Sequence, residues 1–478
     1  MGNPNTSELI RLLTEYLGFT PTTDQEKAMA HIAAFELSLQ ENPVYILKGY
    51  AGTGKTSLMS AYVQLRKHKG LSFVLLAPTG RAAKVLALYT RERAYTIHRQ
   101  IYQFSMGSDG IGKMSIAPNL QRNTVFIVDE ASMIGKGGGG DGVFARHDLL
   151  SDLIRYVFSN TGNKLLMVGD TAQLPPVGLD ISPALETGYL KEGFNVTSYS
   201  FEMTQVKRQS LDSGVLLSAT TIRDLIRNGN TELPFFAPAR FKGDIKRITS
   251  GYELEELLVN TFSGRDFDKG IVVCRTNKRA NLFNQQIRHR ILQFENEIEG
   301  GDYLMVVRNN YYWLEASSRA GFIANGDLIR LTRITRIGEM YGFMFADVEV
   351  QLLDYPEEKE FSVKILLNTL NADGPGLSND DRQALTDAVA EDYQDIPERR
   401  KRMAEIAKNP WYNALHVKFA YAMTCHKTQG GQWPVVIIDQ GYLTDAMISK
   451  EYQRWLYTAL TRSTDKVYLV NFRDEFFE

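Results

Sequence analysis

Cysteine is nearly absent from this sequence, and long apolar runs are absent altogether. Cys274 and Cys425 are the only cysteines in 478 residues, too few for a disulfide framework or a cysteine-rich zinc site. No apolar run approaches the length of about 18 residues that a membrane-spanning helix needs. The first six residues carry neither a basic patch nor an apolar core, so no signal peptide is expected. These absences favour a cytoplasmic globular protein without a membrane partner.

A charge excess of either sign is also missing. The chain has 54 Lys and Arg against 56 Asp and Glu, a formal net charge of −2. It is therefore not a globally basic nucleic-acid binder, and any grip on nucleic acid must come from a local groove. A hydrophobic content of 44% is typical of globular proteins, and the length predicts about three domains.

Phosphate-binding chemistry is concentrated in one stretch. Residues 44–47 form a short apolar run that predicts a buried strand, residues 49–56 fit the pattern G-x-x-x-x-G-K-[ST], and a helical pattern follows. In this order, backbone amides and the positive end of the helix surround phosphate oxygens. Lys55 is expected to reach the β- and γ-phosphates, and the Thr56 hydroxyl to bind Mg²⁺. The predicted nucleotide contacts are Gly49, Ala51, Gly52, Thr53, Gly54, Lys55, Thr56 and Ser57.

A glutamine precedes this loop at a position suited to reading adenine. Thr22, Thr23 or Asp24 can cap a helix in which Gln25 is one of the first residues. The Gln25 amide can donate and accept at once, which matches the N6/N7 edge of adenine. The alternative interpretation is an exposed helical glutamine without a ligand.

Two carboxylates and a further glutamine follow later strands of the same pattern. Asp129 and Glu130 end the apolar run 124–128. At the end of a parallel strand, Asp129 can hold Mg²⁺ and Glu130 can orient or deprotonate the attacking water. Gln173 follows the run 165–169, and its amide can bond the γ-phosphate or that water.

Several polar and aromatic residues suggest nucleic-acid contacts. Thr79 follows the strand predicted over residues 71–77, and His98 lies among hydroxyl, guanidinium and aromatic side chains. Such a mixture suits sugar-phosphate and base contacts. Residues 103–122 predict an inserted hairpin, in which Phe104 either stacks on a base or packs the hairpin onto its domain.

The rest of the chain alternates between two patterns. A second α/β pattern begins near residue 270, gives way to short alternating strands from about residue 300, and resumes at about residue 414. Closely spaced strands of this kind favour a small barrel or sandwich. The predicted division is therefore 1–200 with the hairpin inserted at 103–122, then 201–299, 300–412 and 413–478. Within the third part, the charged stretch 380–408 predicts helices.

The order of these segments resembles the motif set of superfamily 1 helicases. The branch that fits best is superfamily 1B, the 5′-to-3′ branch that includes RecD-like and phage Dda-like enzymes. The resemblance implies an α/β fold with two RecA-like parallel-sheet motor domains. It also implies two inserted subdomains, a β-hairpin pin and an SH3-like β-barrel with a helical excursion.

By position, the resemblance assigns a role to each candidate residue. Arg208 and Arg462 resemble the two arginines that the second motor domain supplies to the γ-phosphate. Gln173 resembles the γ-phosphate sensor, and Gln432 stands where several relatives have a ribose contact. Gln25 resembles the adenine reader. The residues that resemble the lining of a single-strand track are Thr79, His98, Thr424, His426 and Lys427.

The implied function is an ATP-dependent DNA helicase that moves 5′ to 3′ on a single strand and unwinds the duplex ahead. ATP and Mg²⁺ are the implied cofactors, single-stranded DNA and its junctions are the implied partners, and a monomeric motor is expected. DNA repair and recombination are the associated processes. Alternatives are a superfamily 1 RNA helicase, a translocase without strong unwinding, a small-molecule P-loop kinase or ATPase, and a nucleotide switch. No nuclease-like carboxylate cluster is visible, so DNA cleavage is not expected.

Overall fold

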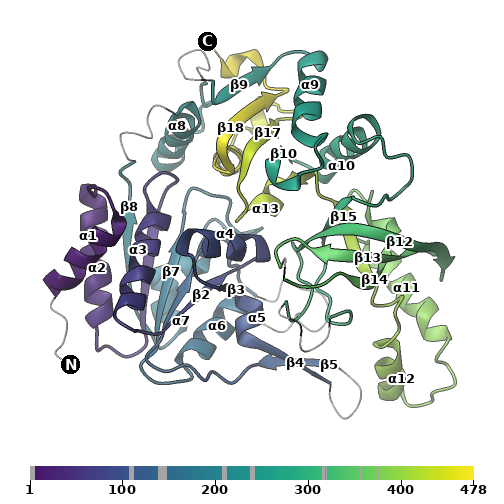
Figure 1. Cartoon of the computed structure of the whole chain (residues 1–478), viewed down its shortest axis with the longest axis horizontal. Coiled ribbons are helices and arrows are strands. Elements are labelled where there is room, and N and C mark those ends of the chain that lie inside the picture. Colours follow the sequence, from purple (N-terminus) through teal and green to yellow (C-terminus); the bar gives the residue numbers. More distant parts are fainter. Residues whose placement is uncertain are drawn as a thin grey trace.

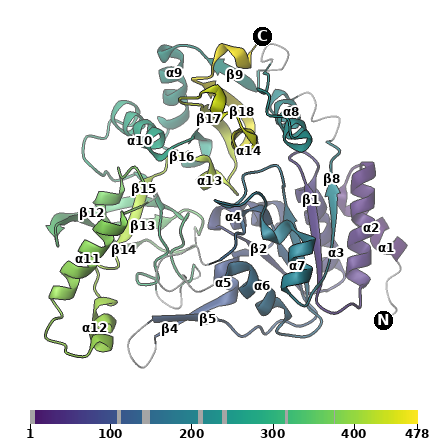
Figure 2. The same cartoon turned by 180° about the vertical axis from the view of Figure 1, so that it is seen from behind.

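The computed structural model describes residues 6–106, 112–137, 148–206, 213–236, 243–314, 318, 320–355, 357–374 and 376–477. Within them the strands form a six-stranded sheet, a five-stranded sheet, a closed barrel and a two-stranded hairpin. Figures 1 and 2 show the six-stranded sheet below the five-stranded sheet, with the barrel beside both. This arrangement confirms the predicted fold class.

The first lobe is built on a parallel sheet of order β3-β2-β6-β7-β1-β8. Its strands are β1 (Pro43–Gly49), β2 (Phe73–Ala77), β3 (Ala94–Thr96), β6 (Val125–Val128), β7 (Lys164–Gly169) and β8 (Thr197–Met203). Because successive side chains point to opposite faces, β1 supplies both layers of core. Tyr45 and Leu47 join one apolar cluster, and Val44 and Ile46 join another. A strand covered on both faces explains the continuous apolar run in the sequence.

Helices cover both faces of this sheet (Figure 1). They are α1 (Thr6–Leu17), α2 (Thr23–Leu37), α3 (Lys55–His68), α4 (Gly80–Thr90), α5 (Ile97–Ile101), α6 (Leu149–Phe158) and α7 (Thr187–Gly193), with short 3₁₀ turns η1 (Ala131–Met133) and η3 (Pro183–Leu185). Leu9 and Leu13 of α1 pack with Tyr62 of α3 on one face, while Leu153 of α6 packs on the other. The core therefore fixes the strand ends from which the candidate residues project.

The second lobe is a parallel sheet of order β16-β10-β17-β18-β9. Its strands are β9 (Ile245–Ile248), β10 (Gly270–Cys274), β16 (Ala422–Thr424), β17 (Trp433–Asp439) and β18 (Ser463–Val470). Its helical segments are α8 (Gly214–Asn228), α9 (Gly251–Phe262), η6 (Phe267–Lys269), α10 (Asn277–Gln286), the π-helical η7 (Ile287–Ile291), α13 (Cys425–Thr428), η9 (Asp445–Met447), α14 (Lys450–Leu460) and η10 (Asp474–Phe476). No helix among the described residues is long and apolar enough to cross a membrane.

The barrel is inserted into the second lobe. Its strands are β11 (Tyr303–Val306), β12 (Leu328–Met340), β13 (Phe343–Leu352), β14 (Phe361–Leu366) and β15 (Leu415–Phe419). The short η8 (Leu367–Thr369) and the helices α11 (Asn379–Glu391) and α12 (Arg399–Ile406) lie between β14 and β15 and form the predicted helical excursion. The chain leaves the second sheet after β10 and returns at β16, the strand beside β10. The two parts share one continuous apolar core.

Two of the predicted domain limits are wrong. The limit at residue 200 falls inside β8, which pairs with β1 over its whole length and belongs to the first sheet. The limit at residue 412 precedes β15, which closes the barrel by pairing with β11 and β14. Both errors have one cause: an apolar strand does not reveal in its own sequence which sheet it joins.

The predicted hairpin is present as β4 (Tyr102–Met106) and β5 (Gly112–Ile116), which pair antiparallel. It projects from the lower part of the first lobe in Figures 1 and 2. Tyr102 and Met114 anchor its base in the apolar core of the first lobe. A hairpin anchored in this way can extend from the lobe without a core of its own.

Candidate functional site

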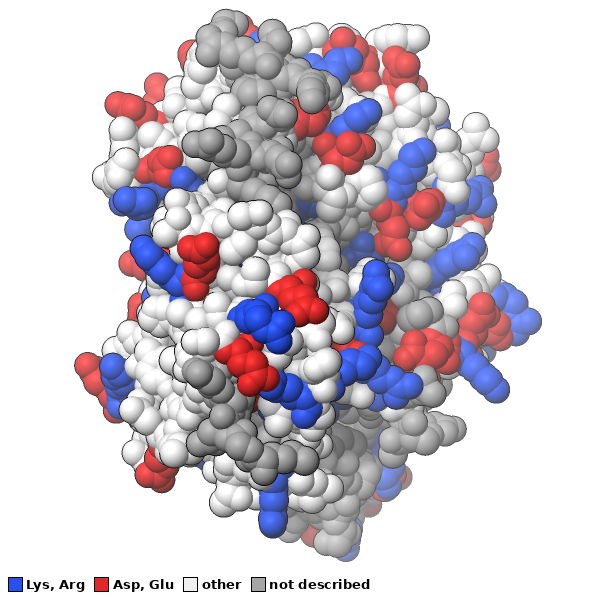
Figure 3. Space-filling view, turned by 60° about the vertical axis from the view of Figure 1, so that its left-hand side comes forward, with Lys and Arg blue, Asp and Glu red and all other residues white. Residues whose placement is uncertain are grey.

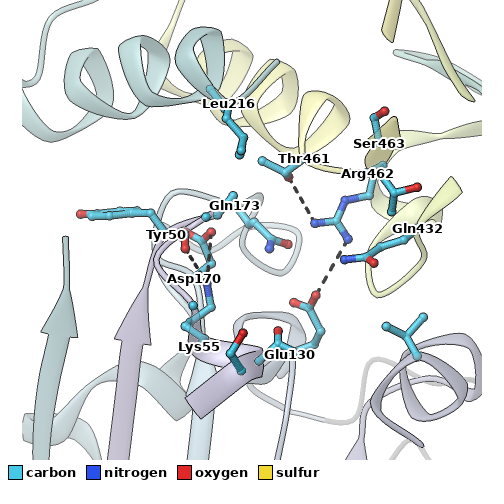
Figure 4. A pocket seen from close by; sticks show the side chains of 18 of the residues that line it. Tyr50, Lys55, Glu130, Asp170, Gln173, Leu216, Gln432, Thr461, Arg462 and Ser463 are labelled. Atoms are coloured by element: carbon cyan, nitrogen blue, oxygen red, sulfur yellow. Dashed lines mark hydrogen bonds and ion pairs between the residues drawn. The ribbon is translucent and has the colours of Figure 1, made fainter. Parts of the chain in front are cut away.

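A cavity of about 500 Å³ lies between the two lobes. Both lobes contribute to its wall, as Figure 4 shows for Lys55 and Glu130 on one side and Arg462 on the other. The predicted residues that line it are Gln25, Ala51, Gly52, Gly54, Lys55, Thr56, Ser57, Asp129, Glu130, Gln173, Gln432 and Arg462. Gly49 and Thr53 belong to the same loop but do not line the cavity.

The loop between β1 and α3 has the geometry that phosphate binding requires. Gly52 and Gly54 have φ values of 78° and 89°, a left-handed backbone that favours glycine. A β-carbon on Gly54 would also lie 2.3 Å from Gln25 Nε2, so a larger residue would displace the Gln25 amide. Lys55 Nζ donates to the carbonyls of Gly49 at 2.6 Å and Tyr50 at 2.9 Å. The ammonium group and the N-terminus of α3 therefore face one cavity, where an anion would be stabilised.

Gln25 is buried, so the interpretation as an exposed helical residue is wrong. It is 1% exposed and forms a reciprocal capping box with Thr22, the N-cap of α2. Its Nε2 also donates to Thr53 O at 3.0 Å. Gln25 thus supports the phosphate loop from behind while it lines the cavity, and its reading of adenine stays a prediction.

The two carboxylates lie directly after β6. Asp129 Oδ1 accepts a hydrogen bond from the Glu130 amide at 2.9 Å, and Glu130 adopts a left-handed φ of 51°. Burial and, secondly, the charge of Glu130 raise the pKa of Asp129 to about 7. Thr56 and Asp129 line the same cavity, and hydroxyl and carboxylate oxygens are ligands that Mg²⁺ prefers. The residues present therefore fit a magnesium ion.

Arg462, the second residue after α14, lines the cavity from the second lobe. Its Nη1 lies 3.9 Å from Glu130 Oε1, and the side chain is 4% exposed. Its own lobe holds it in place, because Nε donates to Thr458 O at 3.1 Å and Nη1 to Gly431 O at 3.3 Å. The predicted second arginine, Arg208, lies outside the described residues.

Two glutamines face the cavity from opposite lobes (Figure 4). Gln173 is 7% exposed, and within the described part of the chain its Oε1 has no hydrogen-bond partner. Gln432 Oε1 accepts a hydrogen bond from the hydroxyl of Tyr89, on α4, at 2.7 Å. Gln173 therefore has a side-chain oxygen that is free to accept a hydrogen bond. Gln432, in contrast, forms a hydrogen bond to the other lobe.

The sequence did not reveal the residues that join the lobes here. Tyr457 of α14 accepts from the Ala51 amide at 2.8 Å and donates to Asp170 Oδ2 at 2.7 Å. Asp170 in turn lies 3.9 Å from Lys55 Nζ. A second set joins α14 and α13 to Leu174. The signal in the sequence that could have indicated these contacts is the presence of polar residues in the otherwise apolar segment before Arg462.

In the first lobe, the residues predicted to contact single-stranded DNA have local structural roles. Thr79 caps α4, since its side chain accepts from the Ala82 amide. His98 lies on α5 beside Tyr102 and Phe322, and burial lowers its pKa to about 4. Phe104 belongs to β4, but its side chain lies outside what the structure describes.

The contacts predicted in the second lobe cluster on α13. Thr424 is its N-cap residue, and burial lowers the pKa of His426. Lys427 Nζ donates to Asn325 Oδ1 of the barrel at 2.7 Å, and burial lowers the Lys427 pKa to about 8. A β-carbon on Gly430 would lie 3.3 Å from Thr79 Oγ1, so the segment after α13 meets the start of α4.

The residues predicted to contact single-stranded DNA therefore lie along the junction of the two lobes and the barrel. They do not lie on the outer surface, where charges of both signs are mixed. Figure 3 shows basic and acidic side chains interspersed over much of one outer face. Within the described residues no cluster of three His, Cys, Asp or Glu could hold a metal ion. The predicted nucleotide-site residues are instead gathered around the cavity between the lobes.

Comparison with known proteins covers most of the chain. Two family models match, an AAA domain over residues 20–224 and a UvrD-like helicase C-terminal domain over residues 419–470. The chain is 24% identical to the ATP-dependent RecD2 DNA helicase of Deinococcus radiodurans, over 88% of this chain and 46% of that protein. It is 23% identical to the ATP-dependent DNA helicase dda of Enterobacteria phage T4, over 95% of this chain and 100% of that protein. The chain thus spans about half of one relative and all of the other.

A solved structure also aligns along the chain. The Pif1 helicase from Bacteroides in complex with ADP-AlF3 and ssDNA has 15% sequence identity and a TM-score of 0.47, and the alignment covers 96% of this chain and 95% of that chain.

Proposed function

We propose that this chain, which resembles RecD-like and phage Dda-like helicases of superfamily 1B, is an ATP-dependent DNA helicase. ATP hydrolysis between the lobes drives 5′-to-3′ movement along a single strand, and the duplex ahead is unwound. The observation that carries the proposal is the position of Arg462 on one lobe facing Lys55 and Glu130 on the other. A site divided in this way couples hydrolysis to the relative movement of two lobes.

Each residue of the cavity has a role in this proposal. Lys55 and the amides at the start of α3 bind the β- and γ-phosphates, and Glu130 orients the attacking water. Thr56 and Asp129 hold Mg²⁺, which neutralises developing phosphate charge. Arg462 stabilises the charge that grows on the γ-phosphoryl oxygens, a contribution worth about 10³–10⁵ in rate for arginines of this kind.

Ligand contacts around this centre complete the nucleotide site. Gln25 contacts adenine, Gln432 contacts the ribose, and Gln173 bonds the γ-phosphate. Arg208 serves as a second arginine by resemblance. The phosphate-loop residues Gly49, Ala51, Gly52, Thr53, Gly54 and Ser57 shape the loop or present amides to the phosphates.

The single strand lies along the junction of the lobes and the barrel. Thr79 and His98 contact it from the first lobe, and Thr424, His426 and Lys427 from the second. Phe104 stacks on a base where the hairpin meets the duplex. The protein acts as a monomer, since both halves of the nucleotide site lie in one chain.

ATP turnover with and without oligonucleotides tests the proposal. Single-stranded DNA is expected to stimulate hydrolysis by the unaltered protein, and Lys55→Ala to abolish it while the protein stays folded. Turnover that is indifferent to oligonucleotides would support a small-molecule P-loop enzyme instead. Stronger stimulation by RNA than by DNA would favour the alternative of an RNA helicase.

Duplexes with a single 5′ or 3′ overhang test polarity and unwinding. Unwinding of the 5′-tailed duplex alone is expected. Unwinding of only the 3′-tailed duplex would overturn the proposed direction. Strand-stimulated hydrolysis without separation of either duplex would indicate a translocase.

A further inference from the structure

The backbone of one residue in the first lobe is held by two side chains of the second. Thr458 Oγ1, on α14, accepts a hydrogen bond from the Leu174 amide at 2.8 Å. Gln429 Nε2, just after α13, donates to the Leu174 carbonyl at 2.7 Å. Thr458 is 0% exposed and Gln429 6% exposed, so water does not compete for these bonds. Both polar groups of Leu174 are therefore satisfied by the opposite lobe.

The two hydrogen bonds to Leu174 lie next to Gln173, the residue proposed to contact the γ-phosphate. Gln173 immediately precedes Leu174, lines the cavity, and has an acceptor Oε1 without a hydrogen-bond partner among the described residues. The other end of the segment is also fixed, because Tyr457 donates to Asp170 at 2.7 Å. The segment 170–174 thus has its ends bonded to the second lobe, and the Gln173 side chain between them lines the cavity (Figure 4).

We propose that Thr458 and Gln429 are positioning residues that set Gln173 against the γ-phosphate. This inference rests on the proposed function and assigns two residues to it. A side chain has few rotamers that reach a ligand, so its productive geometry depends on a fixed backbone. The alternative is that these bonds only join the lobes and leave Gln173 unaffected.

Gln429 also lies between Gln173 and two residues that are predicted to contact single-stranded DNA. It is the C-cap residue of α13, the helix that carries His426 and Lys427. Gln429 thus lies between Leu174 and the two residues predicted to contact DNA, and one hydrogen bond joins it to the Leu174 carbonyl.

Isosteric variants test the role of Thr458. Thr458→Val keeps the shape but removes the acceptor, whereas Thr458→Ser keeps the hydroxyl. Strand-stimulated kcat is expected to fall about tenfold in Thr458→Val, because a buried amide loses its partner, with KM for ATP within about twofold. Thr458→Ser is expected to retain most of the activity. Equal losses in the two variants would overturn the role of the hydroxyl.

A matched control separates this role from general packing. Thr261, on α9, is also buried, and its hydroxyl bonds within its own helix to Leu257 O. Thr261→Val therefore makes the same change in the same lobe without touching Leu174. It is expected to leave turnover unchanged, and a loss equal to that of Thr458→Val would contradict the proposal. Gln429→Met, which removes the donor at similar volume, is expected to reproduce the loss of Thr458→Val.

A double-mutant cycle with Gln173→Ala tests whether Thr458 positions Gln173 or only joins the two lobes. If Thr458 acts through Gln173, Thr458→Val has no further effect once Gln173 is truncated. If the bonds only join the lobes, the fold losses multiply, and that outcome would overturn the proposal.

The same cycle applies to nucleotide binding, measured as the preference for ATPγS over ADP. Each single variant is expected to lower that preference, and the double variant to match Gln173→Ala. This readout does not depend on strand stimulation. A protein that binds ATPγS as expected but ignores DNA would refute the helicase proposal and leave the positioning role standing, whereas an unchanged preference in Thr458→Val would refute the positioning role.

Discussion

Arg462 Nη1 lies 3.9 Å from Glu130 Oε1, and the two residues belong to different lobes. A cation and the proposed water-orienting carboxylate thus meet across the nucleotide cavity. The contact is within the distance of an ion pair but is longer than a hydrogen bond. In the proposed function, the γ-phosphate and its attacking water bind between these two groups. The first two predictions concern this pair.

Replacement of Arg462 is expected to reduce turnover far more than nucleotide binding. Arg462→Ala removes the charge that stabilises the transition state, so kcat for strand-stimulated hydrolysis should fall by about 10³ or more. Steady-state kinetics and ATP binding measure the two effects. Arg473→Ala, at a half-buried arginine that pairs with the exposed Asp445, serves as the control and should leave both unchanged. A fall in affinity alone would make Arg462 a binding residue.

Glu130→Gln is expected to separate ATP binding from hydrolysis. The amide keeps the size of the side chain and can still hydrogen-bond, but it cannot take up a proton from water. ATP should bind with affinity close to that of the unaltered protein while turnover falls steeply. Single-turnover hydrolysis together with equilibrium binding checks this. Loss of binding would indicate that Glu130 is a metal ligand or a structural residue.

The hairpin β4–β5 is expected to serve unwinding but not hydrolysis. It projects from the first lobe, separate from the nucleotide cavity. Replacing residues 107–118 with a short Gly-Ser turn should preserve strand-stimulated ATPase and translocation while unwinding is lost. Forked-duplex unwinding and ATPase assays are compared in parallel. Unwinding at the original rate would place strand separation elsewhere, for example at the barrel.

The buried pair of Arg288 and Asp302 is expected to be important for stability. The two groups form paired hydrogen bonds of 2.8 and 2.9 Å and are 1% and 0% exposed. Asp302→Ala leaves the guanidinium buried without its partner, which should cost about 3–5 kcal/mol in the free energy of unfolding. Denaturant unfolding measures the loss. Asp474→Ala, which removes the exposed carboxylate that pairs with the half-buried Arg247, should have little effect.

His416 is expected to make the protein less stable in mild acid. Burial and the charges of Arg308 and Arg382 lower its pKa from 6.5 to about 3. Between these values the unfolded chain binds a proton that the folded chain does not, so stability falls as pH falls. From pH 7 to pH 5 this residue should contribute a loss of about 2 kcal/mol.

His416→Gln should reduce that pH dependence. Urea unfolding of both proteins at pH 7 and pH 5 provides the comparison. A variant whose stability depends on pH as strongly as the unaltered protein's would show that His416 does not cause the loss.

The sequence was sufficient where local pattern and chemistry coincide. The phosphate loop follows β1 because its glycines, its lysine and the flanking apolar and helical patterns are contiguous. Asp129 and Glu130 were located correctly at the end of a strand for the same reason. The barrel was predicted from closely spaced alternating strands, and the structure confirms it as a closed form.

Features that depend on docking between distant segments were not predictable. Thr458, Gln429 and Tyr457 are ordinary polar residues until α14 packs against the loop after β7. β15 was assigned to the wrong part because nothing in its own sequence shows that it pairs with β11 and β14. Its membership in the barrel is decided by pairing partners far away in the chain.

The insertion of the barrel between β10 and β16 has an evolutionary consequence. These strands are parallel neighbours in the second sheet, and the chain between them passes through α10 and η7, then the barrel, before it returns at the start of β16. An inserted segment of different length between η7 and β16 leaves the strand order of the second sheet unchanged. Gain, loss or exchange of genetic material here therefore changes the barrel without changing the strands that border the cavity between the lobes, and sequence length among homologues should diverge most at this point.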